Sequence, residues 1–175
     1  MQNLDRLMSA CFSGYRAQKF PFPFWEGNRE YDALALQLEE AVRAAINAGY
    51  AFFYCGAAQG FDLLAAETVL RLREMGEDVR LRCAIPFPGQ AEGWPKSWRQ
   101  RYEQVLCQSD ELLTLSSCYS RGCYQLRNRY MVDHSCRLIC YFDGRLGGTA
   151  ATVRYAMKKK LEIVNLAAVI CEGNA

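Results

Sequence analysis

The stretch LICYFDGRLGGT, residues 138–149, decides the fold and points to one edge of it. It begins with an apolar run typical of a buried strand, turns at Asp143 and Gly144, and reaches Gly147, Gly148 and Thr149, where a helix is expected to begin. Glycines let backbone N–H groups approach an anion, and the first turn of a helix adds unsatisfied donors and the positive end of the helix dipole. This arrangement predicts a cradle for a phosphate group.

A second strand-to-helix turn of the same kind lies upstream. The apolar run 50–55 is followed by Gly56, Gly60 and Asp62, and then by a helical stretch through Glu67. Gly56 serves the turn and Gly60 opens the helix, whereas Asp62 either caps the first-turn amides or accepts hydrogen bonds from sugar hydroxyls. Two such turns in one chain predict a nucleotide site, and Glu67 is expected to be solvated or in a salt bridge.

Apolar runs alternate with helical patterns along the chain. Strands are predicted at 7–12, 50–55, 79–85, 111–115, 138–142 and 162–166, and helices at 34–46, 62–75, 97–107, 125–133 and 149–160. Because each parallel return needs a connection of about a dozen residues, this alternation predicts parallel strands with helical crossovers. The expected fold class is α/β: a Rossmann-like, doubly wound, mostly parallel sheet of about six strands with helices on both faces. Residues 1–175 are expected to form a single domain.

Further candidate residues follow the first strand and lie on the fourth helix. Ser13 and Gly14 form a tight exit from the strand, and Arg16 offers a planar fork to phosphate oxygens or is simply solvated. Arg127 either reaches the ligand or pairs on the surface with a carboxylate such as Asp133. In doubly wound sheets ligands bind beyond the carboxyl ends of the strands, where the strand order reverses. Both glycine turns are expected at such ends.

The charge and the composition of the chain argue against two classes, nucleic-acid-binding proteins and membrane proteins. The formal net charge of +2 and the pI near 8.1 give no basic excess, which argues against nucleic acid as the partner. No apolar run approaches the roughly 20 residues that span a bilayer, so neither a membrane anchor nor an export signal is expected. A small-molecule ligand is the expected partner, and a homo-oligomer is left open.

The nine cysteines favour a reducing cytoplasm over a disulfide framework, because disulfide scaffolds are typical of short secreted chains with weak cores. Cys118, Cys123, His134 and Cys136 are zinc-ligand types, but no C-x2-C pair occurs, so no metal site is predicted. The stretch FPFPFW, residues 20–25, is interpreted either as a lid over the site or as an aromatic plug over the sheet edge.

The ordered set of motifs resembles the SLOG superfamily, in particular its YpsA-type branch. The motifs are residues 13–16, Gly56 to Asp62 with 65–67, 85–87, 127–133 and 143–149, and together they cover nearly the whole chain. The resemblance implies a Rossmann-like fold and a pocket for a nucleotide or nucleotide-derived ligand, as in a sensor or effector. The ligand-binding candidates are Ser13, Gly14, Arg16, Gly56, Gly60, Asp62, Arg127, Asp143, Gly147, Gly148 and Thr149.

The same superfamily implies an alternative function. Its LOG-type phosphoribohydrolases use a helix arginine, which Arg127 matches, and a glutamate after the glycine turn, where this chain has Thr152. Threonine neither takes a proton nor stabilises a cationic sugar as a carboxylate does, so Glu67 or Asp62 would have to replace the glutamate. The alternative is therefore an N-glycoside or phosphoribosyl hydrolase acting on nucleoside monophosphates or NAD-derived substrates. DprA-type members bind single-stranded DNA, for which this chain lacks a basic excess.

Overall fold

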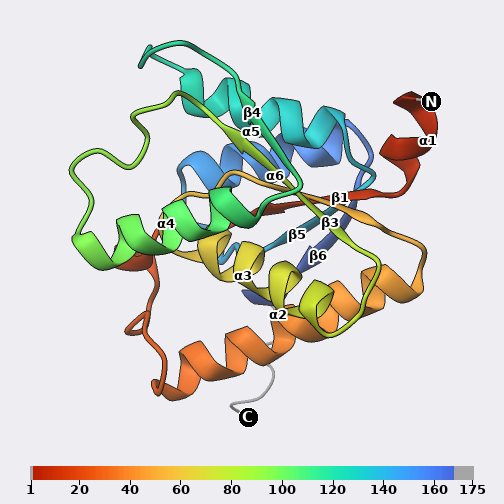
Figure 1. The fold of residues 1–175 in the computed structure, drawn as a ribbon, viewed down its shortest axis with the longest axis horizontal. Coiled ribbons are helices and arrows are strands. Elements are labelled where there is room, and N and C mark those ends of the chain that lie inside the picture. The colour runs from red at the N-terminus through yellow and green to blue at the C-terminus, as the bar shows by residue number, and fades with distance from the viewer. Residues whose placement is uncertain (1, 168–175) are drawn as a thin grey trace.

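A six-stranded sheet lies between two layers of helices in the computed structural model, which describes residues 2–167 (Figure 1). The strands are β1 (Ser9–Ser13), β2 (Phe52–Cys55), β3 (Arg80–Ile85), β4 (Glu111–Thr114), β5 (Arg137–Cys140) and β6 (Glu162–Asn165). The helices are α1 (Gln2–Leu7), α2 (Arg29–Asn47), α3 (Phe61–Glu74), α4 (Lys96–Gln108), α5 (Cys123–Asp133) and α6 (Gly148–Lys158), with a short 3-10 turn, η1 (Ala17–Lys19). The predicted α/β Rossmann-like class is confirmed.

The strand order places a topological switch beside β1. The sheet runs β4-β3-β2-β1-β5-β6, and every neighbouring pair is parallel. The chain therefore builds outward from β1 to β4 and then crosses to the other side of β1 for β5 and β6. Where the connections that follow two adjacent parallel strands lead to opposite sides, the loops separate and a crevice opens at the carboxyl ends of the strands. Here that crevice lies between the ends of β1 and β5.

Each strand of the sheet's centre buries both of its faces. In β1, Phe12 packs with α2, α3 and α4, whereas its neighbour Cys11 packs with α5 and α6, as the two-residue strand period requires. In β5, Ile139 and Leu138 divide in the same way, and all four side chains are fully buried. Figure 1 shows α5 and α6 above the sheet in that view and α2 and α3 below it. Helices packed on both faces of the sheet therefore hold β1 and β5, and with them the switch point, in place.

The predicted elements match the observed ones to within a few residues, and the differences have local causes. Strand β1 begins at Ser9 instead of residue 7, because the short helix α1, which we did not predict, extends to Leu7. Helix α2 begins well before residue 34, since Asn28 accepts hydrogen bonds from the amides of Glu30 and Tyr31 and caps the helix.

The aromatic segment 20–25 packs into the core beside the carboxyl end of β5. The rings of Phe20 and Phe24 are buried and stack with centroids 4.4 Å apart, and Phe20 also lies 4.7 Å from Tyr141. Of these aromatic residues only Trp25 is largely exposed. This packing favours the plug over the lid.

The cysteines in the described part of the chain are free thiols. Eight cysteines are free, and Cys171 lies outside the described residues. Burial raises the pKa of Cys83 and of Cys140 to about 12, so these thiols pack as small apolar groups.

Between residues 2 and 167, no three His, Cys, Asp or Glu side chains gather as metal ligands. No helix in that range combines the length and apolar character needed to cross a bilayer.

Candidate functional site

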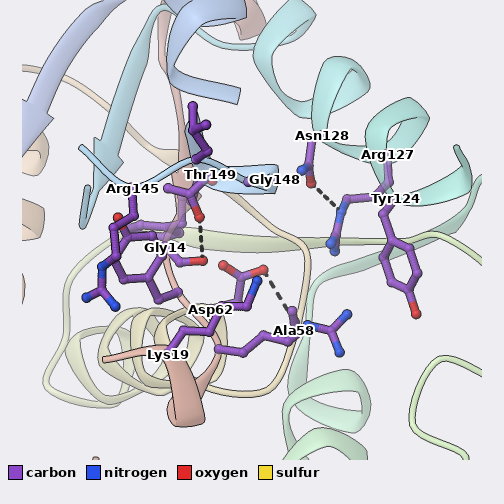
Figure 2. Close-up of a pocket in the computed structure, with 16 residues that line it drawn as sticks. Gly14, Lys19, Ala58, Asp62, Tyr124, Arg127, Asn128, Arg145, Gly148 and Thr149 are labelled. Atoms are coloured by element: carbon purple, nitrogen blue, oxygen red, sulfur yellow. Dashed lines mark hydrogen bonds between the residues drawn. The ribbon is translucent and has the colours of Figure 1, made fainter. Parts of the chain in front are cut away.

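A cavity of about 400 Å³ opens at the switch point, beyond the carboxyl ends of β1 and β5 (Figure 2). Four segments supply its walls: the turn after β1, the loop before α3, one face of α5 and the turn that leads into α6. The lining residues are Phe12, Ser13, Gly14, Tyr15, Arg16, Lys19, Ala58, Asp62, Tyr124, Arg127, Asn128, Arg145, Leu146, Gly147, Gly148 and Thr149. The structure thus brings together eight of the eleven predicted ligand-binding residues.

The amino end of α6 forms an open amide cradle in this cavity. Gly147, with φ of 146°, precedes the helix, and the amides of Gly148 and Thr149 donate to no acceptor in the described part of the chain. Gly148 and Thr149 both line the cavity, and a Cβ built on Gly148 would meet nothing within 4 Å. The Thr149 hydroxyl donates to the Gly14 carbonyl at 3.0 Å and ties the cradle to the β1 turn. Such a helix end attracts anions.

Asp143 lies outside the lining and positions Arg145, which lies within it. The carboxylate accepts hydrogen bonds from the Tyr15 hydroxyl and from the Arg145 guanidinium, the shortest of the latter at 2.6 Å. The hydrogen bonds from Arg145 hold the pKa of Asp143 at about 2, so the ion pair persists in all but strongly acidic solution. The Arg145 guanidinium also lies 5.1 Å from the centre of the Tyr15 ring. Two partners therefore fix the direction of a cationic side chain at the cavity.

The charge of the lining favours an anion. Four cationic side chains, from Arg16, Lys19, Arg127 and Arg145, line the cavity together with one carboxylate, Asp62. The Asp143 carboxylate, just outside the lining, pairs with Arg145, so the cationic excess comes from the other three. Asp62 is buried, and burial raises the pKa of its carboxyl, although the nearby Arg127 and a hydrogen bond from the Ala58 amide oppose that rise. Cationic groups at a partly enclosed site concentrate field lines and raise the local concentration of anions.

Arg127 lines the cavity and also links α5 to the loop before α3 through a hydrogen bond. The side chain is 4% exposed, its Nη1 donates to the carbonyl oxygen of Gly56, and its Nε donates to Asn128 Oδ1 at 2.7 Å. Asn128 in turn donates to Thr152 Oγ1 at 3.0 Å and so links α5 to α6. The surface pairing with Asp133 that we considered does not occur, because Arg127 faces the sheet and Asp133 pairs with Lys159.

The glycines of the loop before α3 serve close packing and lie outside the lining. A Cβ at Gly56 would collide with the Arg127 guanidinium, and one at Gly60, where φ is 108°, would lie 2.5 Å from the Ala17 backbone nitrogen. The first amide of α3, that of Phe61, already donates to the Tyr15 carbonyl at 3.0 Å. Two glycine turns were expected to line the site, whereas among the described residues the glycines of the α6 turn line the cavity and those of the α3 turn do not.

The three candidate catalytic residues do not meet. Arg127 and Asp62 line the cavity, whereas both carboxylate oxygens of Glu67 bind Arg101 at 2.7 Å, away from the lining. Thr152, which occupies the position of the hydrolase glutamate, accepts from Asn128 and donates to the Gly148 carbonyl. Among the lining residues, Asp62 is the one carboxylate available to act as an acid or base.

Six polar or aromatic lining residues were absent from the predicted set: Phe12, Tyr15, Lys19, Tyr124, Asn128 and Arg145. Asn128 lies next to Arg127 within the predicted helix 125–133, whereas Tyr124 lies one residue before its predicted start and joins the observed helix, which begins at Cys123. Arg145 lies inside the glycine turn itself, and Lys19 lies three residues beyond Arg16. Their charge and spacing were visible in the sequence, but the direction of each side chain was not.

A second cavity, of about 310 Å³, adjoins the first between α5 and α6. The two cavities share Asn128 and Gly148. The second is lined by three exposed cationic side chains, those of Arg129, Arg154 and Lys158, and by no carboxylate. A positively charged groove therefore continues from the α6 cradle along the two helices.

The chain belongs to the YspA SLOG family, whose model matches residues 10–170. Among curated proteins, it is similar to a UPF0398 protein of Bacillus thuringiensis (strain Al Hakam), with 29% identity over 130 residues, which cover 73% of this chain and 71% of that protein. A UPF0398 protein of Bacillus cereus (strain AH187) matches with the same identity and coverage.

Two solved structures share the fold. DNA processing protein A from Streptococcus pneumoniae superposes with a TM-score of 0.65 at 15% identity, over 99% of this chain and 59% of that one. DNA processing protein A from Helicobacter pylori, studied for its single-stranded DNA binding mode, gives a TM-score of 0.62 at 16% identity, over 93% of this chain and 66% of that one. This chain thus spans less than two thirds of either neighbour, and the likeness concerns the fold.

Proposed function

We propose that this protein binds a nucleotide or a nucleotide-derived molecule, with a phosphate group at the amino end of α6. The observation that carries the proposal is that the amides of Gly148 and Thr149 donate to no acceptor in the described part of the chain, while both residues line the cavity together with Arg145. A phosphate there would complete the hydrogen bonding of the first helical turn and offset the cationic excess of the lining. The cavity is also within the size range of small-molecule sites.

A thermal-shift and calorimetric panel tests this proposal. The probes are AMP, ribose 5-phosphate, NAD and ADP-ribose, with adenosine as the phosphate-free control. Ligand at 100 times its dissociation constant should stabilise the native state by about 2.7 kcal/mol, whereas adenosine should bind far more weakly. If no phosphate-bearing probe shifts the melting temperature, or if adenosine does as well as AMP, the proposal fails.

The same mixtures test the hydrolase alternative. Chromatography of the AMP, NAD and ADP-ribose samples detects free base or free nicotinamide if the N-glycosidic bond is cleaved. The geometry leaves Asp62 as the one lining carboxylate for this role, since Glu67 pairs with Arg101. Turnover that Asp62→Asn abolishes would establish the enzyme, and intact ligand after prolonged incubation would leave binding as the function.

Single-stranded nucleic acid is a second candidate ligand, and the groove between α5 and α6 favours it. The expectation against nucleic acid rested on net charge, whereas Arg129, Arg154 and Lys158 concentrate positive charge beside the α6 cradle. A solved protein with this fold was studied for binding single-stranded DNA. Fluorescence anisotropy with a labelled oligonucleotide tests the candidate. Binding should weaken steeply with salt, and changing all three cations to Ala should remove most of the salt dependence. Action in the cytoplasm stays a prediction.

A further inference from the structure

Three aromatic side chains contact one another beside the first cavity, which one of them, Tyr124, lines; they are called the aromatic rim here. The rim consists of Phe87, in the loop after β3, Tyr119, in the loop after β4, and Tyr124, in the first turn of α5. The Phe87 ring lies edge-to-face with both tyrosines, with centroids 5.6 Å from Tyr119 and 5.9 Å from Tyr124. The rim thus joins the ends of two neighbouring strands to the cavity wall.

The rim is open to solvent, unlike the other large aromatic cluster near this edge. Tyr119 is 66% exposed, and Phe87 and Tyr124 are partly exposed, whereas Phe20 and Phe24 are each 8% exposed. An edge-to-face contact covers at most one face of a ring, so ring surface remains available to a further aromatic group. Packing in the hydrophobic core therefore does not explain why these three aromatic side chains lie here.

The Tyr124 ring is held by a loose cationic contact. The Arg16 guanidinium lies 5.4 Å from the ring centroid, compared with 3.9 Å for the contact between Arg82 and Phe52 elsewhere in the fold. Arg16 also lines the cavity. A phosphate in the cavity would compete for this guanidinium and leave the face of Tyr124 to another planar group.

The two ends of the cavity differ in chemistry. In Figure 2, Arg145 and Gly14 lie on one side of the view and Tyr124 lies on the other. The first side carries the guanidinium that Asp143 holds, and the α6 amides begin at Gly148, toward the middle of the view; both suit phosphate, whereas the second side carries aromatic surface, which suits a planar base. Asp62 lies between them in the same view, where a sugar with hydroxyl donors would be placed.

We propose that the aromatic rim stacks the base of the bound ligand, chiefly on Tyr124, so that the site selects nucleoside phosphates over sugar phosphates and inorganic anions. This inference rests on the proposed function, because it takes the phosphate to lie at the α6 cradle. It assigns a direction to the ligand: phosphate at α6, sugar near Asp62 and base against α5. Stacking tolerates different bases, so the rim selects a class of ligand and not one base.

Calorimetric titration of AMP and ribose 5-phosphate into the wild type, Tyr124→Ala and Tyr124→Phe tests the inference. Tyr124→Ala should weaken AMP binding about 5- to 150-fold, the range that loss of one base-stacking contact produces. Its affinity for ribose 5-phosphate should stay within about twofold, because the rim lies apart from the phosphate cradle. Tyr124→Phe should keep the affinity for AMP, since the ring alone provides the stack.

Leu126→Ala, at an exposed position on the same helix, is the matched control and should change neither affinity. The inference is overturned if the wild type binds AMP and ribose 5-phosphate equally, or if Tyr124→Ala weakens both alike. Either result leaves the phosphate site in place. If neither compound binds the wild type, the inference fails, and the proposed function fails with it only if NAD and ADP-ribose do not bind either.

Discussion

Replacing Gly148 by Asp should weaken anion binding strongly while the fold persists. A Cβ at this position would meet no atom within 4 Å and Gly148 lines the cavity, so we expect the new side chain to extend into the cavity without displacing the backbone. It would lie within about 5 Å of a phosphate at the α6 amides, where repulsion at an effective dielectric of about 20, reduced by salt, costs about 2–3 kcal/mol. The dissociation constant should therefore rise about 30- to 150-fold. An acidic residue in the first helical turn stabilises the helix by about 0.3–1 kcal/mol, so the unliganded protein should not melt earlier.

Thermal melts with and without ADP-ribose measure both effects. At a concentration that stabilises the wild type by about 2.7 kcal/mol, the variant should gain only about 0.3–0.9 kcal/mol. Gly148→Asn has a side chain of nearly the same size without the charge, so it separates bulk from repulsion and should retain more of the shift. A full ligand shift in Gly148→Asp, with a folded protein, would refute the placement of the phosphate at α6.

Three further predictions concern the surrounding framework. Gly60→Ala should destabilise the protein by several kcal/mol in urea unfolding, because its Cβ would press on backbone, whereas Gly76→Ala, with φ of 101° and open space, should cost only about 1–2 kcal/mol. Equal losses would argue against tight packing at Gly60. Arg127→Ala should cost about 2–4 kcal/mol of unfolding free energy, since it removes buried hydrogen bonds and opens a cavity, while the exposed Arg129→Ala should stay within about 0.5 kcal/mol. Burial raises the pKa of Asp62, so the charged form of its carboxyl opposes folding once the pH has risen through that pKa. Asp62→Asn should therefore raise the melting temperature at pH 7, and this gain in melting temperature should disappear in acidic solution. Affinity for ADP-ribose, whose own charge stays constant, should rise as the pH falls toward that pKa, and Asp62→Asn should flatten the profile.

The sequence predicts the fold well because the fold depends on local periodicity. Apolar spacing from Leu34 to Ile46 identified α2, and the short apolar runs identified all six strands, since each is a contiguous pattern. The start of α2 was missed because it depends on one cap, Asn28, in a stretch without apolar spacing. Helix α1 is too short to show a period.

The site was predictable only in part, because side-chain direction depends on contacts that are distant in sequence. Glu67 was a candidate acid until its pairing with Arg101, 34 residues away, was known. Gly60 has the composition of an anion loop, but its backbone packs against the turn after β1. The orientation of Arg145 depends on Asp143, whose other partner, Tyr15, lies 128 residues away. None of these pairings can be inferred from the spacing of residues in the local sequence.

The most direct test of the account follows the backbone amides themselves. Two-dimensional NMR spectra of the labelled protein, recorded during titration with AMP, report the environment of each N–H group. The account predicts large, saturable shifts for the amides of Gly148 and Thr149, together with movement of the Arg145 side-chain signal. If AMP binds while those two amides keep their positions and other residues shift instead, the central claim is wrong.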